Sequence, residues 1–137
     1  MLRGLTTISF YAHDVVAARD WYAEFLGVRA YFQRPEQGDP VCVEFRVGDY
    51  QHELGIIDAR FAPDGWSTED GGAIVYWAVD DLEATWERLL EMRATPFEKP
   101  TKRGPGFVTA SVRDPFGNIL GVMVNHHYMD VLAGRKG

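Results

Sequence analysis

The strongest constraint on how this chain can fold is an internal repeat. Two stretches have the alternating side-chain pattern of a β-strand and end at an aspartate, Thr7–Asp14 and Ile74–Asp81. Each is followed by a stretch in which apolar residues recur at spacings of three and four, over Val15–Leu26 and Leu82–Met92. This periodicity predicts a helix with one apolar face. The sequence therefore predicts two halves that begin with the same strand and helix.

The ends of both predicted helices carry recognisable signals. Asp14 and Asp81 precede the first helical residues, where a carboxylate can accept hydrogen bonds from the exposed N–H groups of the first turn. Gly27 follows the first helix and suits a left-handed C-terminal cap. Arg93 stands at the equivalent place in the second half, so that helix is expected to end without a glycine.

Three further strands are predicted after each helix. In the first half they span residues 29–33, 41–47 and 50–57, with a tight turn at Gly48-Asp49. In the second half they span residues 95–98, 107–113 and 119–125, with a turn at Asp114-Pro115-Phe116-Gly117-Asn118. Residues 33–40 and 99–106 are predicted to be loops. Each half thus has the order strand, helix and three strands.

Composition excludes several classes of protein. Of the 137 residues, 46% are hydrophobic and 25% are charged, which is typical of a globular protein and not of a disordered one. No apolar run is long enough to cross a bilayer, and the N-terminus lacks the apolar stretch of a signal peptide. The single cysteine, Cys42, cannot form an internal disulfide, and the net charge is −6. We therefore expect a cytoplasmic protein that binds neither membranes nor nucleic acid.

The doubled order of elements, the helix ending in Phe25-Leu26-Gly27 and the turn at 114–118 resemble the vicinal oxygen chelate superfamily. That superfamily includes glyoxalase I, extradiol dioxygenases, fosfomycin-resistance enzymes and bleomycin-resistance proteins. The resemblance implies an α+β fold of two βαβββ modules, whose curved mixed sheets surround a cavity and carry their helices outside. Module one would span about residues 5–57, a linker 58–72, module two 73–125 and a tail 126–137. A homodimer is also expected, because relatives often complete their pockets across a two-fold interface.

Alternation assigns the strand residues to two faces. The uniformly apolar face is predicted to pack on the helices; Phe10 and Trp77 belong to it. The opposite face mixes aromatic, hydroxyl, amide and charged side chains, which suits a small-molecule pocket; a partly wet sheet surface or a dimer contact is the alternative. The predicted ligand-binding residues on this face are Thr7, Ser9, Tyr11, Glu44, Arg46, Gln51, Glu53, Tyr76, Phe107, Thr109, Ser111, Met123 and Asn125.

Metal-dependent relatives hold a divalent ion with His and Glu side chains at four positions on the first and last strand of each module. Carried over one at a time, the resemblance places Thr7, Gly55, Ile74 and Gly121 at these positions. None of the four offers an ordinary side-chain ligand. We therefore expect no metal ion and no other cofactor.

Other groups could supply chemistry in place of a metal. Glu53 and Glu44 are candidate catalytic acids or bases, although pairing with Arg46 is the favoured explanation for both. If the last strand continued to residue 127, His127 would lie on the same face as Asn125 and could line the entrance of a pocket. Cys42 has no histidine at a spacing that would indicate an activated thiolate.

Three functions remain open after this reading. The first is a binding protein, independent of metal, for a small aromatic or amphipathic metabolite or drug. The second is a lyase, isomerase or dioxygenase that uses displaced ligands or a glutamate base. The third is a regulatory or scaffold subunit. Trp66 could cover a pocket or contact a partner, and the basic loop 99–106 could close over an anion or be merely solvated.

Overall fold

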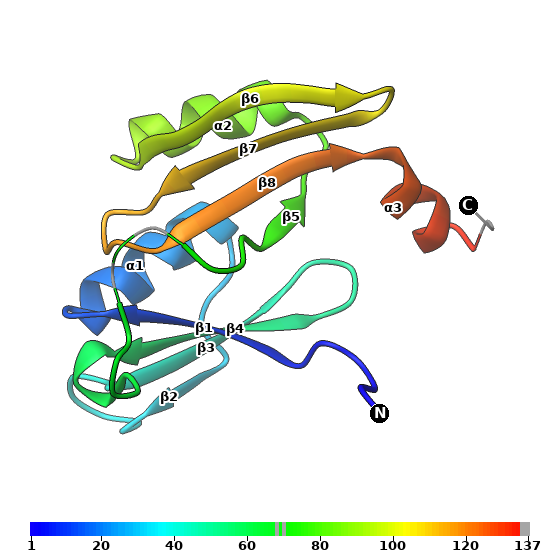
Figure 1. The fold of residues 1–137 in the computed structure, drawn as a ribbon. Helices are drawn as coiled ribbons and strands as arrows, with labels where there is room; N and C mark the ends of the chain where they lie inside the picture. Colours follow the sequence, from blue (N-terminus) through cyan, green and yellow to red (C-terminus); the bar gives the residue numbers. More distant parts are fainter. Residues whose placement is uncertain (68, 70, 135–137) are drawn as a thin grey trace. The chain divides into compact units, whose positions relative to one another are not determined.

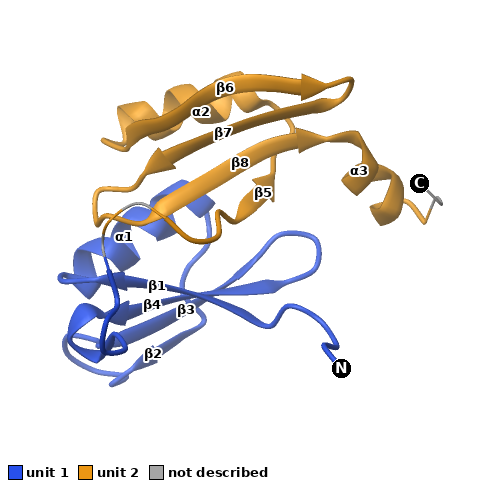
Figure 2. Ribbon diagram, in the orientation of Figure 1, with its two compact units in different colours: residues 1–67 blue, residues 68–137 orange. Residues whose placement is uncertain are grey.

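The computed structural model describes residues 1–67, 69 and 71–134, which form two compact units (Figures 1 and 2). Unit 1 comprises residues 1–67 and unit 2 residues 68–137. Each unit has a strand, a helix and three strands in that order, so the predicted α+β class and the repeated module are confirmed. No helix in the described part of the chain has both the length and the apolar character needed to span a bilayer.

Unit 1 is a four-stranded mixed sheet in the order β1-β4-β3-β2. The strands β1 and β4 run parallel, and the other neighbours are antiparallel. Helix α1 packs against β1, β3 and β4. The elements are β1 (Thr7–Ala12), α1 (Val15–Leu26), β2 (Phe32–Arg34), β3 (Cys42–Val47), β4 (His52–Asp58) and the short 3₁₀ helix η1 (Ala59–Phe61).

Unit 2 repeats this topology with the sheet order β5-β8-β7-β6. Here β5 and β8 are parallel, and helix α2 packs against β6, β7 and β8. A further helix, α3, follows β8 directly (Figure 1). The elements are β5 (Tyr76–Ala78), α2 (Leu82–Glu91), β6 (Thr95–Gly104), β7 (Phe107–Arg113), β8 (Ile119–Asn125) and α3 (His126–Leu132).

The helix ends form as the sequence predicts. The Asp14 carboxylate accepts from the Ala17 N–H at 3.0 Å, and the Asp81 carboxylate accepts from the Ala84 N–H at 3.0 Å. Gly27 caps α1 with a φ of 71°. After α2, Arg93 itself adopts a φ of 71°, so an arginine takes the left-handed conformation that a glycine takes in unit 1.

The core of each unit lies between its helix and the apolar face of its sheet. In unit 1, α1 contributes Trp21 and Tyr22, whose rings meet edge to face at 4.7 Å between centroids. In unit 2, α2 contributes aliphatic residues instead, chiefly Leu82 and Leu89. The buried hydrophobic residues of the strands are Ile8, Phe10, Ala12, Val43, Phe45, Leu54, Ile56, Ala110, Val112, Leu120 and Val122. Helix and sheet are thus held together by the face that alternation predicts.

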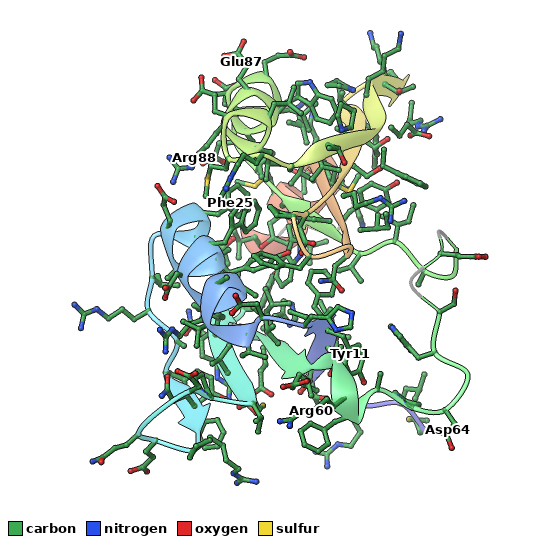
Figure 3. All side chains as sticks on the ribbon, turned by 90° about the vertical axis from the view of Figure 1, so that its left-hand side faces the viewer. Tyr11, Phe25, Arg60, Asp64, Glu87 and Arg88 are labelled. Atoms are coloured by element: carbon green, nitrogen blue, oxygen red, sulfur yellow. The ribbon has the colours of Figure 1, made fainter. Side chains whose placement is uncertain are left out.

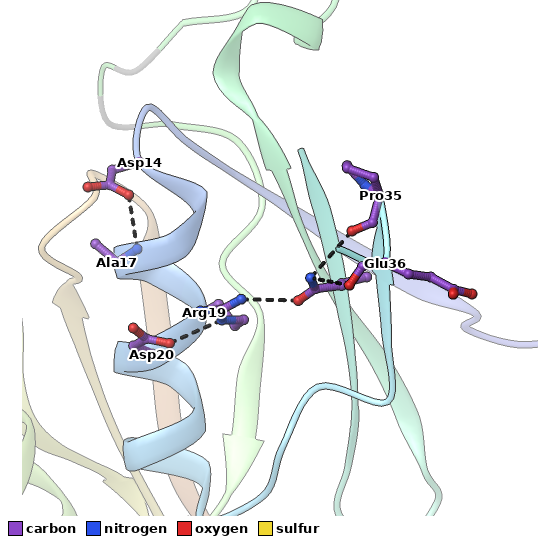
Figure 4. A network of polar contacts seen from close by, with 7 residues as sticks. Asp14, Ala17, Arg19, Asp20, Pro35 and Glu36 are labelled. Atoms are coloured by element: carbon purple, nitrogen blue, oxygen red, sulfur yellow. Dashed lines mark hydrogen bonds and ion pairs between the residues drawn. The ribbon is translucent and has the colours of Figure 1, made fainter. Parts of the chain in front are cut away.

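A polar network also joins α1 to the chain around β2 (Figure 4). The Arg19 Nη1 on α1 donates to the Gln33 Oε1 on β2 at 3.0 Å. The Gln33 amide nitrogen in turn donates to the carbonyls of Pro35 and Glu36, at 3.3 and 3.0 Å. This network fixes the start of the loop that follows β2.

Four predictions of local structure were wrong. Residues 99–104 belong to β6 rather than to a loop, and register shifts in the β6–β7 pair accommodate the irregular sequence. Prolines are tolerated because β6 is the edge strand. Gln51 lies in the turn before β4 with a φ of 53°, so it is not a strand residue. Ile74 precedes β5, which begins at Tyr76. Trp77 is half-buried, whereas its predicted counterpart Phe10 is buried.

Candidate functional site

The sheet of unit 1 has one face turned away from α1, which we call the open face of unit 1. The strand register aligns its residues in rows across β1, β4 and β3. The predicted residues Thr7, Ser9, Tyr11, Glu44, Arg46 and Glu53 all share this face. The rows are Thr7–Glu53–Arg46, Ser9–Gly55–Glu44 and Tyr11–Ile57–Cys42.

Tyr31 joins the charged residues of the first two rows. Its hydroxyl oxygen lies 2.6 Å from Glu44 Oε2 and 2.6 Å from Glu53 Oε2. The Thr7 hydroxyl donates to Glu53 Oε1 at 3.0 Å, and Arg46 Nη2 lies 3.3 Å from Glu53 Oε2. The Arg46 guanidinium also lies over the Tyr31 ring, 4.8 Å from its centroid. We call these five residues (Thr7, Tyr31, Glu44, Arg46 and Glu53) the Tyr31 cluster.

The hydrogen bonds of the cluster set its protonation. Because Tyr31 faces two carboxylates, the pKa of its phenol is raised well above the ordinary value, and the hydroxyl stays a donor. The same bond from Tyr31 lowers the pKa of Glu53, and Thr7 and Arg46 lower it further against the effect of desolvation. Glu53 is thereby stabilised as a carboxylate, which makes it a weaker base.

Cys42 lies on the same face but is not activated as a nucleophile. Desolvation raises the pKa of its thiol, and the charge of Glu44 adds to this effect. The thiol is half-buried. It therefore contributes a small, weakly polar surface to the row that contains Tyr11.

Aromatic surface borders the polar cluster. The Tyr11 and Trp66 rings lie 4.9 Å apart between centroids, and Trp66 is 53% exposed. Figure 3 shows Tyr11 on the side of its strand away from α1. Trp66 lies in the predicted linker, and the contact brings it beside the last row of β1. The open face of unit 1 thus combines charged hydrogen-bonding groups with an aromatic pair, in which Tyr11 is half-buried and Trp66 is exposed.

Unit 2 also has an open face, the one turned away from α2. Its rows include the predicted residues Tyr76, Ser111, Thr109 and Met123. Ser111 is 0% exposed, and it is opposite Gly121 on β8 and Glu98 on β6. The rows are Tyr76–Gly121–Ser111–Glu98 and Ala78–Met123–Thr109–Thr101.

Arg103 spans two residues of this face. Its Nε donates to the Thr109 hydroxyl at 3.1 Å, and its Nη2 forms an ion pair with Glu98. The Ser111 hydroxyl, which lies on the same face, is buried without a hydrogen-bond partner among the described residues. Buried polar groups are rarely left in this state.

The four residues that the sequence resemblance assigns to metal-ligand positions do not offer a site for a metal ion. The Thr7 hydroxyl is used in its bond to Glu53, and Gly55 and Ile74 provide no donor side chain. A Cβ atom at Gly121 would lie 2.7 Å from the Tyr76 ring and 2.7 Å from the Val75 carbonyl oxygen, so the ring fills the place of a ligand side chain. The described residues contain no group of three His, Cys, Asp or Glu side chains that could bind a metal.

Four other sequence candidates lie outside the rows described above. The Asn125 side chain caps α3, where its oxygen accepts from the Tyr128 N–H at 3.1 Å. His127 therefore lies on a helix rather than on the strand that parity assumed. The Gln51 amide donates to the Gly48 carbonyl at 3.0 Å within the hairpin turn. Phe107 remains at the end of β7, opposite Asn125.

The sequence reading did not identify Tyr31, Glu98 or Arg103 as site residues. Tyr31 precedes β2, where no alternation marks a face, and its partners are 13 and 22 residues away. Glu98 and Arg103 lie on the strand whose second half was read as a loop. The basic, glycine-rich character of residues 99–106 gave a signal for Arg103, because it allowed contact with an anion as an alternative to a solvated loop.

Comparisons with known proteins agree with this architecture. The model of the Glyoxalase/Bleomycin resistance protein/Dioxygenase superfamily matches residues 4–122. No curated protein matches.

Solved structures with the same fold include proteins with different named roles. The fosfomycin resistance protein FosX of Mesorhizobium loti has a TM-score of 0.67 at 13% identity, over 96% of this chain and 99% of that chain. TioX of Micromonospora sp. ML1 has a TM-score of 0.67 at 17% identity, over 89% and 98%. A lactoylglutathione lyase of Agrobacterium tumefaciens has a TM-score of 0.64 at 20% identity, over 90% and 94%. At these identities, the likeness concerns the fold alone.

Proposed function

Because the chain belongs to the Glyoxalase/Bleomycin resistance protein/Dioxygenase superfamily, we propose that it binds a small aromatic or amphipathic molecule without a resident metal ion. The binding surface is the open face of unit 1. The observation that carries this proposal is the joint presence of the Tyr31 cluster and the Tyr11–Trp66 pair on one sheet face. Such a face offers an apolar ring contact and, beside it, fixed hydrogen-bonding groups.

The state of the cluster supports binding over catalysis by Glu53. Three neighbours stabilise the ionised Glu53, and its lowered pKa weakens it as a proton acceptor. Tyr31 and Arg46 hold each other through the cation–π contact, so the polar groups are already oriented before a ligand arrives. Groups that are already oriented lose less conformational entropy when a ligand binds.

The proposal is tested by a thermal-shift screen of small aromatic and amphipathic compounds, followed by calorimetry on chelator-treated protein. Hits are expected to bind equally well with and without chelator. Tyr31→Phe removes only the hydroxyl and should weaken a hit that uses the cluster by about tenfold. Tyr50→Phe is the matched control, because it removes one hydroxyl from an exposed tyrosine of the hairpin.

The aromatic part of the surface has its own pair of variants. Trp66→Ala should weaken an aromatic hit, whereas Trp66→Phe should retain most of the affinity because it keeps a ring opposite Tyr11. A screen without any stabilising compound, or a hit that binds only when a divalent ion is added, would refute the proposal.

One observation favours a second function, a lyase, isomerase or dioxygenase with a glutamate base. The Tyr31 phenol lies against both carboxylates, so Glu44 could take a proton from a substrate and, through the phenol, pass a proton on to Glu53, which would then be protonated. If a hit compound is converted into a product, and Glu44→Gln abolishes this turnover, the protein is an enzyme and the proposal of binding alone is wrong.

A further inference from the structure

We propose that the open face of unit 2 contains a carboxylate-binding site formed by Arg103 and Ser111, which Glu98 occupies while no ligand is bound. The inference extends the proposed binding of small molecules to unit 2 and rests on that function. It adds the chemical class of the group recognised there, a planar carboxylate.

The Ser111 hydroxyl is unsatisfied. The side chain is 0% exposed and has no hydrogen-bond partner among the described residues. It projects from the face opposite the buried Ala110 and Val112, which alternate with it along β7. A buried hydroxyl of this kind gains a hydrogen bond when an acceptor reaches it.

Arg103 presents its guanidinium to the same face of the sheet. Nε and Nη2 form one edge of the guanidinium, and here that edge contacts the Thr109 hydroxyl and the Glu98 carboxylate. Thr109 precedes Ser111 by two residues on β7, and Glu98 is opposite Ser111 on β6. The guanidinium edge is therefore held by the two residues that neighbour Ser111 on this face, Thr109 along β7 and Glu98 across on β6.

The charged group that contacts Arg103 in this structure is itself a carboxylate, that of Glu98. A guanidinium edge matches a carboxylate, and Glu98 provides that group from within the chain. The side chains of Arg103 and Glu98 are 50% and 45% exposed, so their pair is weak and can exchange for another carboxylate. A ligand carboxylate that replaced Glu98 could accept from Arg103 with one oxygen and from Ser111 with the other.

Tyr76 gives the site an aromatic neighbour. Its ring covers Gly121, which lies opposite Ser111 in the same row. An aromatic carboxylate therefore suits the face better than an aliphatic one, because its ring can lie against Tyr76 while its carboxylate meets Arg103.

The experiment is an amide NMR titration of the full chain with benzoate, and with benzamide as the neutral molecule of the same shape. Benzoate should cause saturable shifts at residues 98–103 and 109–111, and benzamide much smaller ones. Arg103→Gln should weaken benzoate binding at least tenfold, and Ser111→Ala severalfold. Glu98→Gln should strengthen it severalfold, because it removes the competing carboxylate.

Lys102→Gln is the matched control, since it removes one positive charge from the same strand without removing the guanidinium. It should change the benzoate affinity less than twofold. Ser111→Ala should leave the melting temperature unchanged or raise it, because a purely structural serine would give the opposite result. Glu98→Gln is expected to increase the affinity for benzoate. A gain of this kind cannot result from a variant that fails to fold.

Two results would overturn the inference. One is benzoate binding to unit 2 that Arg103→Gln and Glu98→Gln leave unchanged. The other is saturable shifts in unit 1 alone, which would support the proposed function while removing the carboxylate site from unit 2. Equal shifts with benzoate and benzamide at residues 98–111 would also contradict recognition of a carboxylate.

Discussion

Gly55 in unit 1 and Gly121 in unit 2 occupy the same place in the two repeats, on the last strand of each, yet for different reasons. A Cβ atom at Gly55 would meet only ordinary contacts, at 3.8 Å from the Ile8 carbonyl oxygen and from Thr7 Cγ2. A Cβ atom at Gly121 would be 2.7 Å from the Tyr76 ring and from the Val75 carbonyl oxygen. The glycine of unit 1 leaves space beside Glu44, whereas that of unit 2 makes room for an aromatic ring. One fold thus supports two chemically different open faces.

The largest expected difference between the units concerns the apolar residue of each first strand. Phe10 on β1 is buried, and Trp77 on β5 is half-buried. Phe10→Ala should destabilise the protein by about 3–5 kcal/mol, and Trp77→Ala by only about half as much. Urea unfolding followed by circular dichroism measures both. Equal losses would show that the two first strands are equally buried.

The two glycines provide the next test. Gly121→Ala should cost roughly 1–3 kcal/mol, because the Val75 backbone cannot move as easily as a side chain can. Gly55→Ala should change the unfolding free energy by less than about 0.5 kcal/mol. Urea unfolding followed by circular dichroism measures both changes. A tolerated Gly121→Ala would mean that Tyr76 does not cover this position.

The helix caps should respond alike, since Asp14 and Asp81 make the same bond at 3.0 Å. Asp14→Ala and Asp81→Ala should each cost about 1 kcal/mol, and replacement by asparagine should cost much less. Thermal unfolding compares the four variants. A clear loss in one unit and none in the other would break the equivalence of the two modules.

The smallest effect is the pH dependence that Glu53 gives to unit 1. Its pKa is lower in the folded protein than in the unfolded chain, so its stabilising contribution is present above the unfolded value of about 4.3. The contribution is lost as the pH falls through the folded value. The difference in melting temperature between the protein and Glu53→Gln should therefore be largest near neutral pH and vanish in acid. A difference that grows on acidification would contradict the assigned direction.

Local signals predicted most of the fold. The apolar spacing of three and four set both helices, and Asp14, Asp81 and Gly27 marked their ends as observed. The turn predicted at residues 114–118 forms, and within it the Asp114 carboxylate accepts from the N–H groups of Phe116 and Asn118 at 2.9 Å. These features depend on neighbours in the chain, and such neighbours are visible in a sequence.

The site was less predictable because its contacts are distant in sequence. Alternation placed Glu44 and Glu53 on one face, but nothing near Tyr31 indicated that its hydroxyl reaches both. Residues 99–104 have the proline and glycine content of a loop, yet pairing with β7 draws them into an edge strand. The contact of Arg103 with Thr109 depends on that pairing. The unsatisfied hydroxyl of Ser111 is likewise visible only in the structure.

The central claim, that this chain binds small molecules without a resident ion, is tested most directly by its metal content. Protein purified without chelator from cells supplied with zinc, iron and manganese would be analysed by plasma mass spectrometry. The account predicts far less than one ion per chain, and a melting temperature that chelator does not change. One tightly held ion per chain, with a melting temperature that falls when the ion is removed, would contradict it.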